Sequence, residues 1–292
     1  MRDTQDGERS PVITATGLWT SFMTETGYQD AVRGVSFQVS KGEIVGIVGE
    51  SGSGKSTIAM SLMQLHEKGA AAYSGTVEYS GRNLVACSAT EIRQVRGAGI
   101  GMIFQDPQSS LNPVYKVGRQ IREAVQLHRR MSRTLASQRA LELLDAVGIP
   151  DPVSCFSRYP HELSGGMKQR VMIAIAIASD PEVLIADEPT TALDVTVQDQ
   201  ILELIRSLSR SREMSVIFIS HDLAVVSQLC DSVLVMYQGE IVERGPTAEL
   251  FRSPRHPYTK KLLSAALLPS RDELVLARRS AQVIDGGDDS RG

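Results

Sequence analysis

The sequence predicts an α/β fold in which the strands of a parallel β-sheet are covered on both faces and a separate helical subdomain is present. Three observations support this prediction. Apolar runs that are continuous rather than alternating recur along the chain, as expected for parallel strands buried on both faces. Strand-like and helix-like segments alternate around these runs. A glycine-rich loop over 49–57 joins one of the runs to a helical segment.

Composition limits the classes of function. The chain has 292 residues, of which 42% are hydrophobic and 22% charged, enough for one large core with a smaller subdomain. Its net charge of −3 shows no basic excess, so we expect no nucleic-acid partner. The three cysteines lie far apart, without metal-site or redox spacing, and suit a reducing cytoplasm. The N-terminus lacks an export signal and no apolar run reaches ~20 residues, so any membrane role is expected to be peripheral.

The elements follow from the chain in order. Residues 12–48 contain short β-type runs separated by turn residues, and a helical pattern begins at Ser56. Helix-forming residues dominate from about 117 to 147, with leucines at helical spacing and Gly148 as the expected stop. Charged residues and glycines dominate after Pro269, where we expect a loosely ordered tail. The expected elements include strands over 44–48, 75–79, 183–186 and 216–219, helices over 56–66 and 197–209, and the helical leucines Leu135, Leu141, Leu143 and Leu144.

The loop Gly49-Glu50-Ser51-Gly52-Ser53-Gly54-Lys55-Ser56-Thr57 lies between a predicted strand and a predicted helix, the context that a phosphate-binding loop requires. Its glycines allow backbone amides to turn inward around the α- and β-phosphates of ATP, and the helix N-terminus adds a positive end. Lys55 is expected to bridge the β- and γ-phosphates, and the Ser56 hydroxyl to coordinate Mg²⁺. The loop therefore predicts ATP and Mg²⁺ as ligands.

Two carboxylates end the apolar run Val183-Leu184-Ile185-Ala186-Asp187-Glu188. Asp187 is expected to hold Mg²⁺, directly or through water, and Glu188 to accept a proton from the attacking water or polarise it. An acidic strand end on its own is usually a solvated loop entry. The presence of the phosphate loop in the same chain favours the catalytic interpretation.

A third motif, Leu163-Ser164-Gly165-Gly166-Met167-Lys168-Gln169-Arg170, opens a helical segment. Ser-Gly-Gly at a helix start presents amides and a hydroxyl to an anion, although Ser164 could also be an ordinary helix cap. One nucleotide does not need two phosphate cradles in one chain. Two copies that face each other would use both.

Together these motifs resemble the ATP-binding-cassette family, whose signature is the 163–169 segment shortly before an Asp-Glu strand, and the resemblance extends from about Val12 to about Ala266. It implies a P-loop NTPase cassette of the α/β class, with a RecA-like core, an antiparallel β subdomain and an α-helical subdomain. The implied divisions are a flexible N-terminus over 1–11, the core and β subdomain over 12–106 and 181–250, the helical subdomain with the signature over 107–180, and a short extension over 251–292, largely flexible after 269.

The resemblance also assigns roles to individual side chains. Gln105, in Phe104-Gln105-Asp106-Pro107, would touch Mg²⁺ and the attacking water, and its loop would couple the nucleotide to a membrane partner. His221 would contact the γ-phosphate and orient Glu188. Without the other motifs, Gln105 could be a surface loop residue and His221 a structural residue at a strand end.

Two further positions are implied for nucleotide binding. Asp194, in Ala192-Leu193-Asp194, would help to position the phosphate loop of an opposing subunit, and it could equally cap the following helix. Phe22 has the better spacing for an aromatic that stacks on adenine, with Tyr28 as the alternative. Either aromatic could simply be a packed strand residue.

Several segments resemble the oligopeptide, dipeptide and nickel importer branch of this family, including 104–113, 186–195 and Arg255-His256-Pro257-Tyr258-Thr259. This branch implies a second, paralogous ATPase subunit, two membrane permeases and a solute-binding protein, with this chain at the cytoplasmic face of the inner membrane. Many relatives add a cysteine-containing extension that binds an iron-sulfur cluster. The tail over 274–292 has no cysteine, so we expect no cluster and a shortened C-terminal region.

The expected function is therefore ATP hydrolysis that powers the uptake of peptides or a related small solute, with closure of two subunits around ATP. Alternatives are the ATPase of an exporter, or a cassette protein of DNA repair or translation. The latter usually has a long coiled-coil insertion or two tandem cassettes, and neither is visible. A purely structural P-loop scaffold would lack the lysine or the glutamate, whereas Lys55 and Glu188 are both present.

Overall fold

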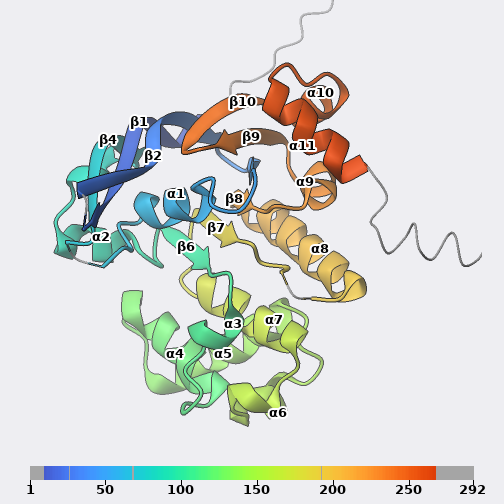
Figure 1. The fold of residues 1–292 in the computed structure, drawn as a ribbon. Helices are drawn as coiled ribbons and strands as arrows, with labels where there is room; N and C mark the ends of the chain where they lie inside the picture. Colours follow the sequence, from blue (N-terminus) through green and yellow to red (C-terminus); the bar gives the residue numbers. More distant parts are fainter. Residues whose placement is uncertain (1–9, 26, 68, 192, 268–292) are drawn as a thin grey trace, which may run out of the picture.

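The computed structural model describes residues 10–25, 27–67, 69–191 and 193–267. The tail that the sequence predicts after 269 lies outside these residues, and so does the region for which we expect no iron-sulfur cluster. Most of the expected flexible N-terminus also lies outside them. The first strand begins at Pro11, one residue before the expected boundary. Two sheets and a group of helices make up the described part of the chain (Figure 1).

The centre of the molecule is a six-stranded sheet with the strand order β10-β9-β3-β8-β7-β6. Neighbouring strands are parallel except β10, which pairs with β9 antiparallel. Every residue of β3, β6, β7 and β8 is buried, which explains their continuous apolar sequences. The strands are β3 (Ile44–Val48), β6 (Ile100–Ile103), β7 (Val183–Asp187), β8 (Ser215–Ile219), β9 (Ser232–Tyr237) and β10 (Glu240–Pro246).

The second sheet is antiparallel, with the order β2-β1-β4-β5. The short β-type runs expected near the N-terminus are two 14-residue strands that pair along their lengths. Helix α1 (Lys55–Leu62) packs into the apolar cluster between the two sheets. The strands of this sheet are β1 (Pro11–Thr24), β2 (Gly27–Ser40), β4 (Ala71–Tyr79) and β5 (Arg82–Asn83).

Alternate residues of the buried strands serve two different cores. Ile217 and Ile219 of β8 belong to the cluster shared with the antiparallel sheet. Val216 and Phe218 of the same strand belong to the cluster shared with the helices on the other side. Successive side chains of a strand point to opposite faces, so a strand between two cores needs apolar residues at every position.

Helices α3 to α7 form a group at the bottom of the view in Figure 1. The single helical stretch expected over 117–147 is two helices, because Ser132 starts a new helix by accepting a hydrogen bond from the Leu135 amide. Of the leucines at helical spacing, Leu143 and Leu144 are buried, whereas Leu135 is 54% exposed. The helices are α3 (Pro107–Ser110), α4 (Val117–His128), α5 (Arg133–Ala146), α6 (Pro152–Ser157), the 3₁₀ turn η2 (Pro160–Glu162) and α7 (Gly165–Ala176).

Capping residues set the ends of the remaining helices. Helix α1 ends at Leu62 rather than near His66, because Gln64 is in the left-handed region with φ of 49°. Helix α8 is longer than expected, from the Asp194 cap to the left-handed Glu213. The other helices are η1 (Leu84–Ala86), α2 (Ala89–Val95), α8 (Val195–Arg212), α9 (Leu223–Leu229), α10 (Thr247–Arg252) and α11 (Pro257–Leu267).

An ion-pair cluster joins the helical group to the central sheet layer. Asp180, just after α7, accepts hydrogen bonds from Arg129 at the end of α4, from Arg139 of α5 and from Arg212 of α8, at 2.6, 2.9 and 2.6 Å. One carboxylate is thus shared by three guanidinium groups from three segments. None of the described helices is both long enough and apolar enough to cross a membrane.

Candidate functional site

The phosphate loop leaves β3 and enters α1, as the sequence predicts. Gly49 has φ of 156°, and a Cβ there would lie 2.2 Å from the Met236 carbonyl oxygen. Gly54 has φ of 103°, and a Cβ there would lie 2.6 Å from the Ala31 carbonyl oxygen. Both positions therefore require glycine for conformation and for space. The loop is held in shape by close backbone approach from β2 and β9.

The loop has the properties of an anion site. Gly54 caps α1 without any side-chain hydrogen bond to the first helical amides. Ser53 is 6% exposed, and its hydroxyl has no hydrogen-bond partner among the described residues. A buried hydroxyl beside uncapped amides at a helix N-terminus matches the oxygen atoms of a phosphate group.

Lys55 lies beneath the loop and is 5% exposed. Its Nζ donates to the carbonyl oxygens of Gly49 and Glu50, at 2.8 and 3.0 Å. Burial lowers the pKa of Lys55, and the negative charges of Glu188 and Asp187 partly oppose this shift. A buried ammonium whose present acceptors are neutral carbonyls is well suited to an incoming polyphosphate.

Ser56 connects the loop to the carboxylates at the end of β7. Its hydroxyl donates to Asp187 Oδ1 at 3.0 Å. Burial raises the pKa of Asp187, whereas the Ser56 hydrogen bond lowers it. The neighbouring Thr57 contributes its carbonyl oxygen to the Ser61 hydroxyl at 2.6 Å. The structure therefore brings the two expected Mg²⁺ ligands Ser56 and Asp187 together.

Three side chains converge on one oxygen of Glu188. Its Oε2 accepts from Gln105 Nε2 at 3.1 Å and from Thr191 Oγ1 at 2.9 Å, and it lies 3.2 Å from His221 Nδ1. The Glu188 side chain is 12% exposed, whereas that of His221 is 59% exposed. The carboxylate is thus fixed at the bottom of a site whose histidine faces solvent.

Thr191 is a member of this cluster that the sequence analysis missed. Its amide also donates to the Glu188 carbonyl oxygen at 3.2 Å, so residues 188–191 form a turn that returns the hydroxyl to the carboxylate. A threonine three residues after the glutamate, in a strand-to-helix loop, was the available signal. The spacing alone did not reveal which way its side chain faces.

The signature residues lie apart from the phosphate loop. Ser164 caps α7 by accepting from the Met167 amide at 3.3 Å, and Asp194 caps α8 by accepting from the Val197 amide at 2.9 Å. Ser164, Gly165 and Asp194 are exposed, and Gly166 is half-buried. Within the described ranges, no hydrogen bond or ion pair joins these four residues to 49–57. Both helix caps that the sequence analysis offered as alternatives are therefore present, and both capping residues are exposed.

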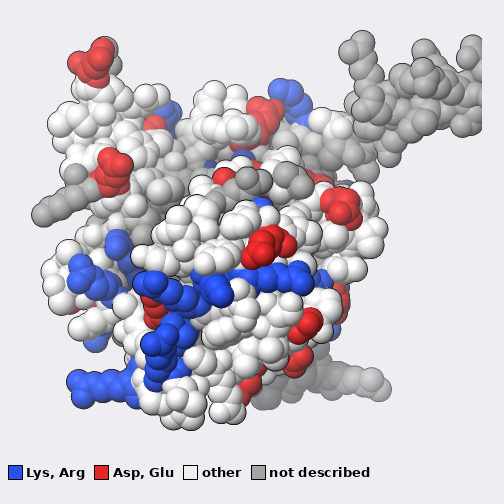
Figure 2. Space-filling view, turned by 90° about the horizontal axis from the view of Figure 1, so that it is seen from below, with Lys and Arg blue, Asp and Glu red and all other residues white. Residues whose placement is uncertain are grey.

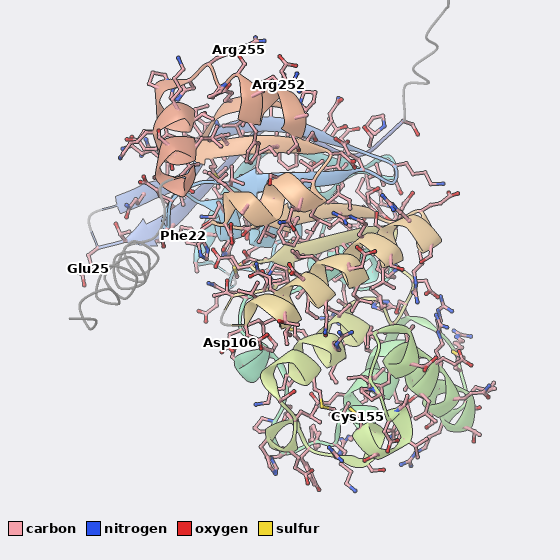
Figure 3. The ribbon with its side chains drawn as sticks, turned by 90° about the vertical axis from the view of Figure 1, so that its right-hand side faces the viewer. Phe22, Glu25, Asp106, Cys155, Arg252 and Arg255 are labelled. Carbon is pink, nitrogen blue, oxygen red and sulfur yellow. The ribbon has the colours of Figure 1, made fainter. Side chains whose placement is uncertain are left out.

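The two aromatic candidates differ in environment. Phe22 is half-buried on β1, and its ring meets the His66 ring edge-on with 4.9 Å between centroids. Tyr28 on β2 is 62% exposed. Figure 3 shows Phe22 on the strand side of the molecule and Asp106, next to Gln105, beside the helical group. Among the described residues, no hydrogen bond or ring contact joins either aromatic to the loop, so the choice of Phe22 stays a prediction.

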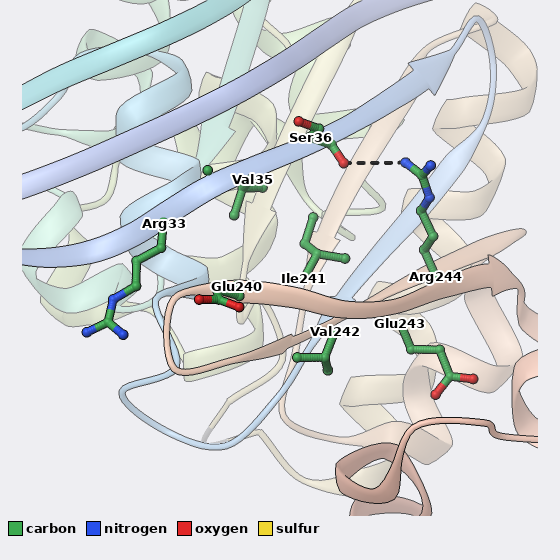
Figure 4. A pocket seen from close by; sticks show the side chains of 9 residues that line it. Arg33, Val35, Ser36, Glu240, Ile241, Val242, Glu243 and Arg244 are labelled. Atoms are coloured by element: carbon green, nitrogen blue, oxygen red, sulfur yellow. Dashed lines mark hydrogen bonds between the residues drawn. The ribbon is translucent and has the colours of Figure 1, made fainter.

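A hollow of about 470 Å³ lies between β2 and β10 (Figure 4). Its lining includes Arg33, Glu240 and Arg244, and Arg244 Nη1 donates to the Ser36 carbonyl oxygen at 3.4 Å. It contains none of the site residues that the sequence predicts. The position of this hollow therefore does not indicate the candidate functional site. The predicted site residues lie mainly at the carboxyl ends of the parallel strands.

Comparison with known proteins gives consistent results. Residues 32–191 match the ABC transporter family model, residues 156–227 match an AAA domain model, and residues 242–288 match the oligopeptide/dipeptide transporter C-terminal region. The oligopeptide transport ATP-binding protein OppD of Bacillus subtilis is 52% identical over 246 residues, covering 84% of this chain and 69% of that protein. A Brucella abortus protein named for peptide import ATP-binding is 50% identical over 264 residues, covering 90% and 79%.

Further similarity is found to a glutathione import protein and to solved structures. The glutathione import ATP-binding protein GsiA of Salmonella choleraesuis is 52% identical over 260 residues, covering 87% of this chain and 42% of that protein. The dimeric structure of MJ0796, a bacterial ABC transporter cassette, is 27% identical with a TM-score of 0.72, covering 80% of this chain and 98% of that one. A post-hydrolysis dimer of MJ0796 bound to ADP and Pi has the same TM-score at 26% identity.

The matched segment 32–191 contains the phosphate loop, the signature helix and the Asp187-Glu188 strand end, and it spans more than half of the 292 residues. These are the parts for which the sequence predicts nucleotide binding and hydrolysis. The fold agrees with that of solved cassettes. The chain belongs to the ATP-binding subunits of ABC transporters, and it is an ABC-type ATPase.

Proposed function

We infer that this chain powers an importer for peptides or a related small solute. The match of residues 242–288 to the oligopeptide/dipeptide transporter C-terminal region carries this inference, because that segment lies outside the ATPase motifs common to all cassettes. Relatives named for oligopeptide transport and glutathione import support it. The solute is expected to bind to other chains, since the ATPase motifs account for the chemistry-bearing residues of this one.

Mg²⁺ fits the oxygen atoms at the end of β7. The Ser56 hydroxyl and an Asp187 carboxylate oxygen lie 3.0 Å apart, and Mg²⁺ prefers one or two such ligands together with water and phosphate oxygens. Gln105 is the proposed additional contact. When bound with ATP, a cation held by Ser56 and Asp187 would neutralise negative charge that develops on the phosphates.

The remaining residues have separate proposed roles in hydrolysis. The loop amides and Lys55 hold the phosphates, and Glu188 accepts a proton from the attacking water. Gln105 and His221 help to orient that water and the γ-phosphate, and both already contact Glu188. Thr191 fixes the carboxylate from the opposite side of the turn. Proton acceptance by a carboxylate held on three sides requires little reorganisation.

A second subunit completes the proposed site. Ser164, Gly165 and Asp194 are exposed, and among the described residues no hydrogen bond or ion pair joins them to the loop of their own chain, so they are available to another protomer. In this proposal the partner is a paralogous ATPase subunit, and ATP joins the phosphate loop of one chain to the signature tip of the other. Hydrolysis removes that contact and lets the pair open.

The helical group and the Gln105 loop are the proposed contact with two permeases at the cytoplasmic face of the inner membrane. Lys and Arg side chains gather on the face seen from below in Figure 2. The α4–α5 region contains exposed bases, although the whole chain has a net charge of −3; they are Lys116, Arg119, Arg129, Arg130 and Arg133. An acidic cytoplasmic segment of a permease would complement this surface. A solute-binding protein would act through the permeases.

The test of this function is Glu188→Gln. The substitution keeps the shape and removes the proton acceptor, so ATP hydrolysis should fall by about 10²-fold or more, and ATP should trap a dimer with the partner subunit in size-exclusion chromatography. Glu203→Gln is the matched control, since Glu203 is 69% exposed on α8 and its carboxylate pairs with Arg206 of the same helix. Retained turnover in Glu188→Gln would contradict the catalytic assignment. If neither peptides nor glutathione stimulate hydrolysis by the reconstituted wild-type transporter, the importer assignment is contradicted.

A further inference from the structure

The segment Arg255-His256-Pro257-Tyr258-Thr259 has no role in the hydrolytic chemistry described above. It marks the importer branch in the sequence, and in the structure it opens α11, which lies with α10 at the C-terminal end of the described chain (Figure 1). It nevertheless contacts the phosphate loop directly. The hydroxyl of Tyr258 accepts a hydrogen bond from the backbone amide of Glu50 at 2.9 Å.

Neighbouring groups reinforce this contact. Tyr258 is 7% exposed, and its ring packs on the Tyr237 ring with 4.2 Å between centroids. Lys261, one helical turn later, pairs with the Glu50 carboxylate at 3.7 Å. Glu50 of the loop is thus contacted at its backbone by Tyr258 and at its side chain by Lys261, both of α11.

The start of α11 is itself fixed. The Glu243 carboxylate of β10 accepts from the amides of Arg255 and His256, at 2.7 and 2.9 Å. His256 Nδ1 in turn accepts from the Tyr258 amide at 3.2 Å. These bonds anchor the backbone on both sides of Pro257, so the Tyr258 hydroxyl reaches Glu50 from a rigid support rather than from a free helix end.

A second contact holds the same side of the loop. The Gly239 amide, in the turn between β9 and β10, donates to the Ser53 carbonyl oxygen at 3.0 Å. Lys55 holds the carbonyl oxygens of Gly49 and Glu50 from the inner side. The peptide group between Gly49 and Glu50 is therefore held at its N–H by Tyr258 and at its carbonyl oxygen by Lys55.

We propose that Tyr258 is a positioning residue for nucleotide binding, which holds the phosphate loop in its binding conformation through the Glu50 amide and thereby links the C-terminal segment to the ATP site. The proposal rests on the proposed role of this loop in holding the phosphates. A loop that is preorganised loses less conformational freedom when the phosphates bind. Since ground state and transition state use the same loop, the effect belongs in the binding step rather than in the chemical step.

The test is Tyr258→Phe, which removes one oxygen and keeps the packed ring. The affinities for MgATP and for ADP, measured by calorimetry on the full chain, should both fall about five-fold, the size of one net hydrogen bond. KM for ATP should rise by the same factor, with kcat within two-fold of wild type. Tyr237→Phe is the matched control, because it removes a hydroxyl from the stacked partner ring, and that hydroxyl accepts from Gln238 Nε2 at 3.2 Å rather than from the loop.

Equal affinities in wild type and Tyr258→Phe, or an equal loss in Tyr237→Phe, would overturn the proposal. If Tyr258→Phe does not fold, amide hydrogen exchange of wild type without nucleotide decides instead. The Glu50 amide should exchange at least ten-fold more slowly than those of Ser51 and Gly52, and equal rates would overturn the proposal. Wild type that binds no nucleotide would refute the proposed function itself, so the two failures are distinguishable.

Discussion

Thr191→Val tests whether the hydroxyl next to Glu188 contributes to hydrolysis. Valine has nearly the shape of threonine but no hydroxyl, so the substitution removes the 2.9 Å hydrogen bond and leaves the packing. Thr191 is exposed, so we expect the fold to be unaffected. The Gln105 and His221 contacts at 3.1 and 3.2 Å would still hold the carboxylate, but from fewer directions.

The magnitude follows from the strength of that bond. A hydrogen bond to a charged acceptor is worth about 1.5–3 kcal/mol net. Because two partners of Glu188 remain, we take the lower end, and a loss of about 1.4 kcal/mol corresponds to ten-fold in rate. We therefore expect kcat to fall about ten-fold. KM for ATP should be unchanged, since Thr191 has no proposed contact with the nucleotide.

The assay is steady-state phosphate release from the assembled transporter, with Thr191→Ser as the matched control. Serine keeps the donor, so its kcat should stay within about two-fold of wild type, the range that small packing changes cover. In a Glu188→Gln background, Thr191→Val should have no further effect, because the two residues act through one group. A kcat of Thr191→Val above half the wild-type value, or an equal loss in the serine variant, would refute the reasoning.

Two further predictions concern stability. Burial lowers the pKa of His66, so the unfolded chain takes up a proton more readily than the folded chain. The contribution of neutral His66 to the free energy of unfolding is therefore present above about pH 6.5 and is lost as the pH falls through the lowered pKa. His66→Phe keeps a ring against Phe22 and should make the urea midpoint fall less steeply from pH 7.5 to 5.5 than in wild type; parallel slopes would contradict this. Asp180→Asn leaves three guanidinium groups without their shared charge and should lower the free energy of unfolding by about 1 kcal/mol at low salt, with a smaller loss at 1 M salt. A salt-independent loss in urea titrations would argue against an electrostatic origin.

The central strands could be predicted from the sequence because burial on both faces requires apolar residues in succession, and such a run is visible in a short stretch of sequence. The runs at 183–186 and 216–219 correspond to β7 and β8 to within one residue at each end. The helix ends could not be predicted as well, because they depend on capping contacts. Ser132 divides the helical stretch expected over 117–147 into two helices. Helix α1 ends earlier than the pattern indicated, and the left-handed Gln64 follows its end.

The candidate site was predictable where it is contiguous in sequence and only by resemblance where it is not. The loop from Gly49 to Thr57 has its own spacing, and Lys55 and Ser56 lie in the structure where the pattern indicated. Gln105 and Glu188 are 83 residues apart, so no local pattern could show that their side chains meet. Thr191 was missed because the direction of its hydroxyl depends on the turn after Glu188 rather than on residue type.

The backbone at Glu188 explains how two adjacent carboxylates serve one site. Side chains of successive strand residues point to opposite faces, so an extended Glu188 would turn away from the crevice that Asp187 faces. Glu188 instead has φ of 46°, in the left-handed region, which costs roughly 1 kcal/mol for a residue with a side chain. Its amide donates to the Ile219 carbonyl oxygen at 2.9 Å, and this bond to the end of β8 holds the turn. The strained backbone turns the Glu188 carboxylate toward Gln105 and His221. The strain therefore lies at the residue that the proposed reaction uses as its proton acceptor.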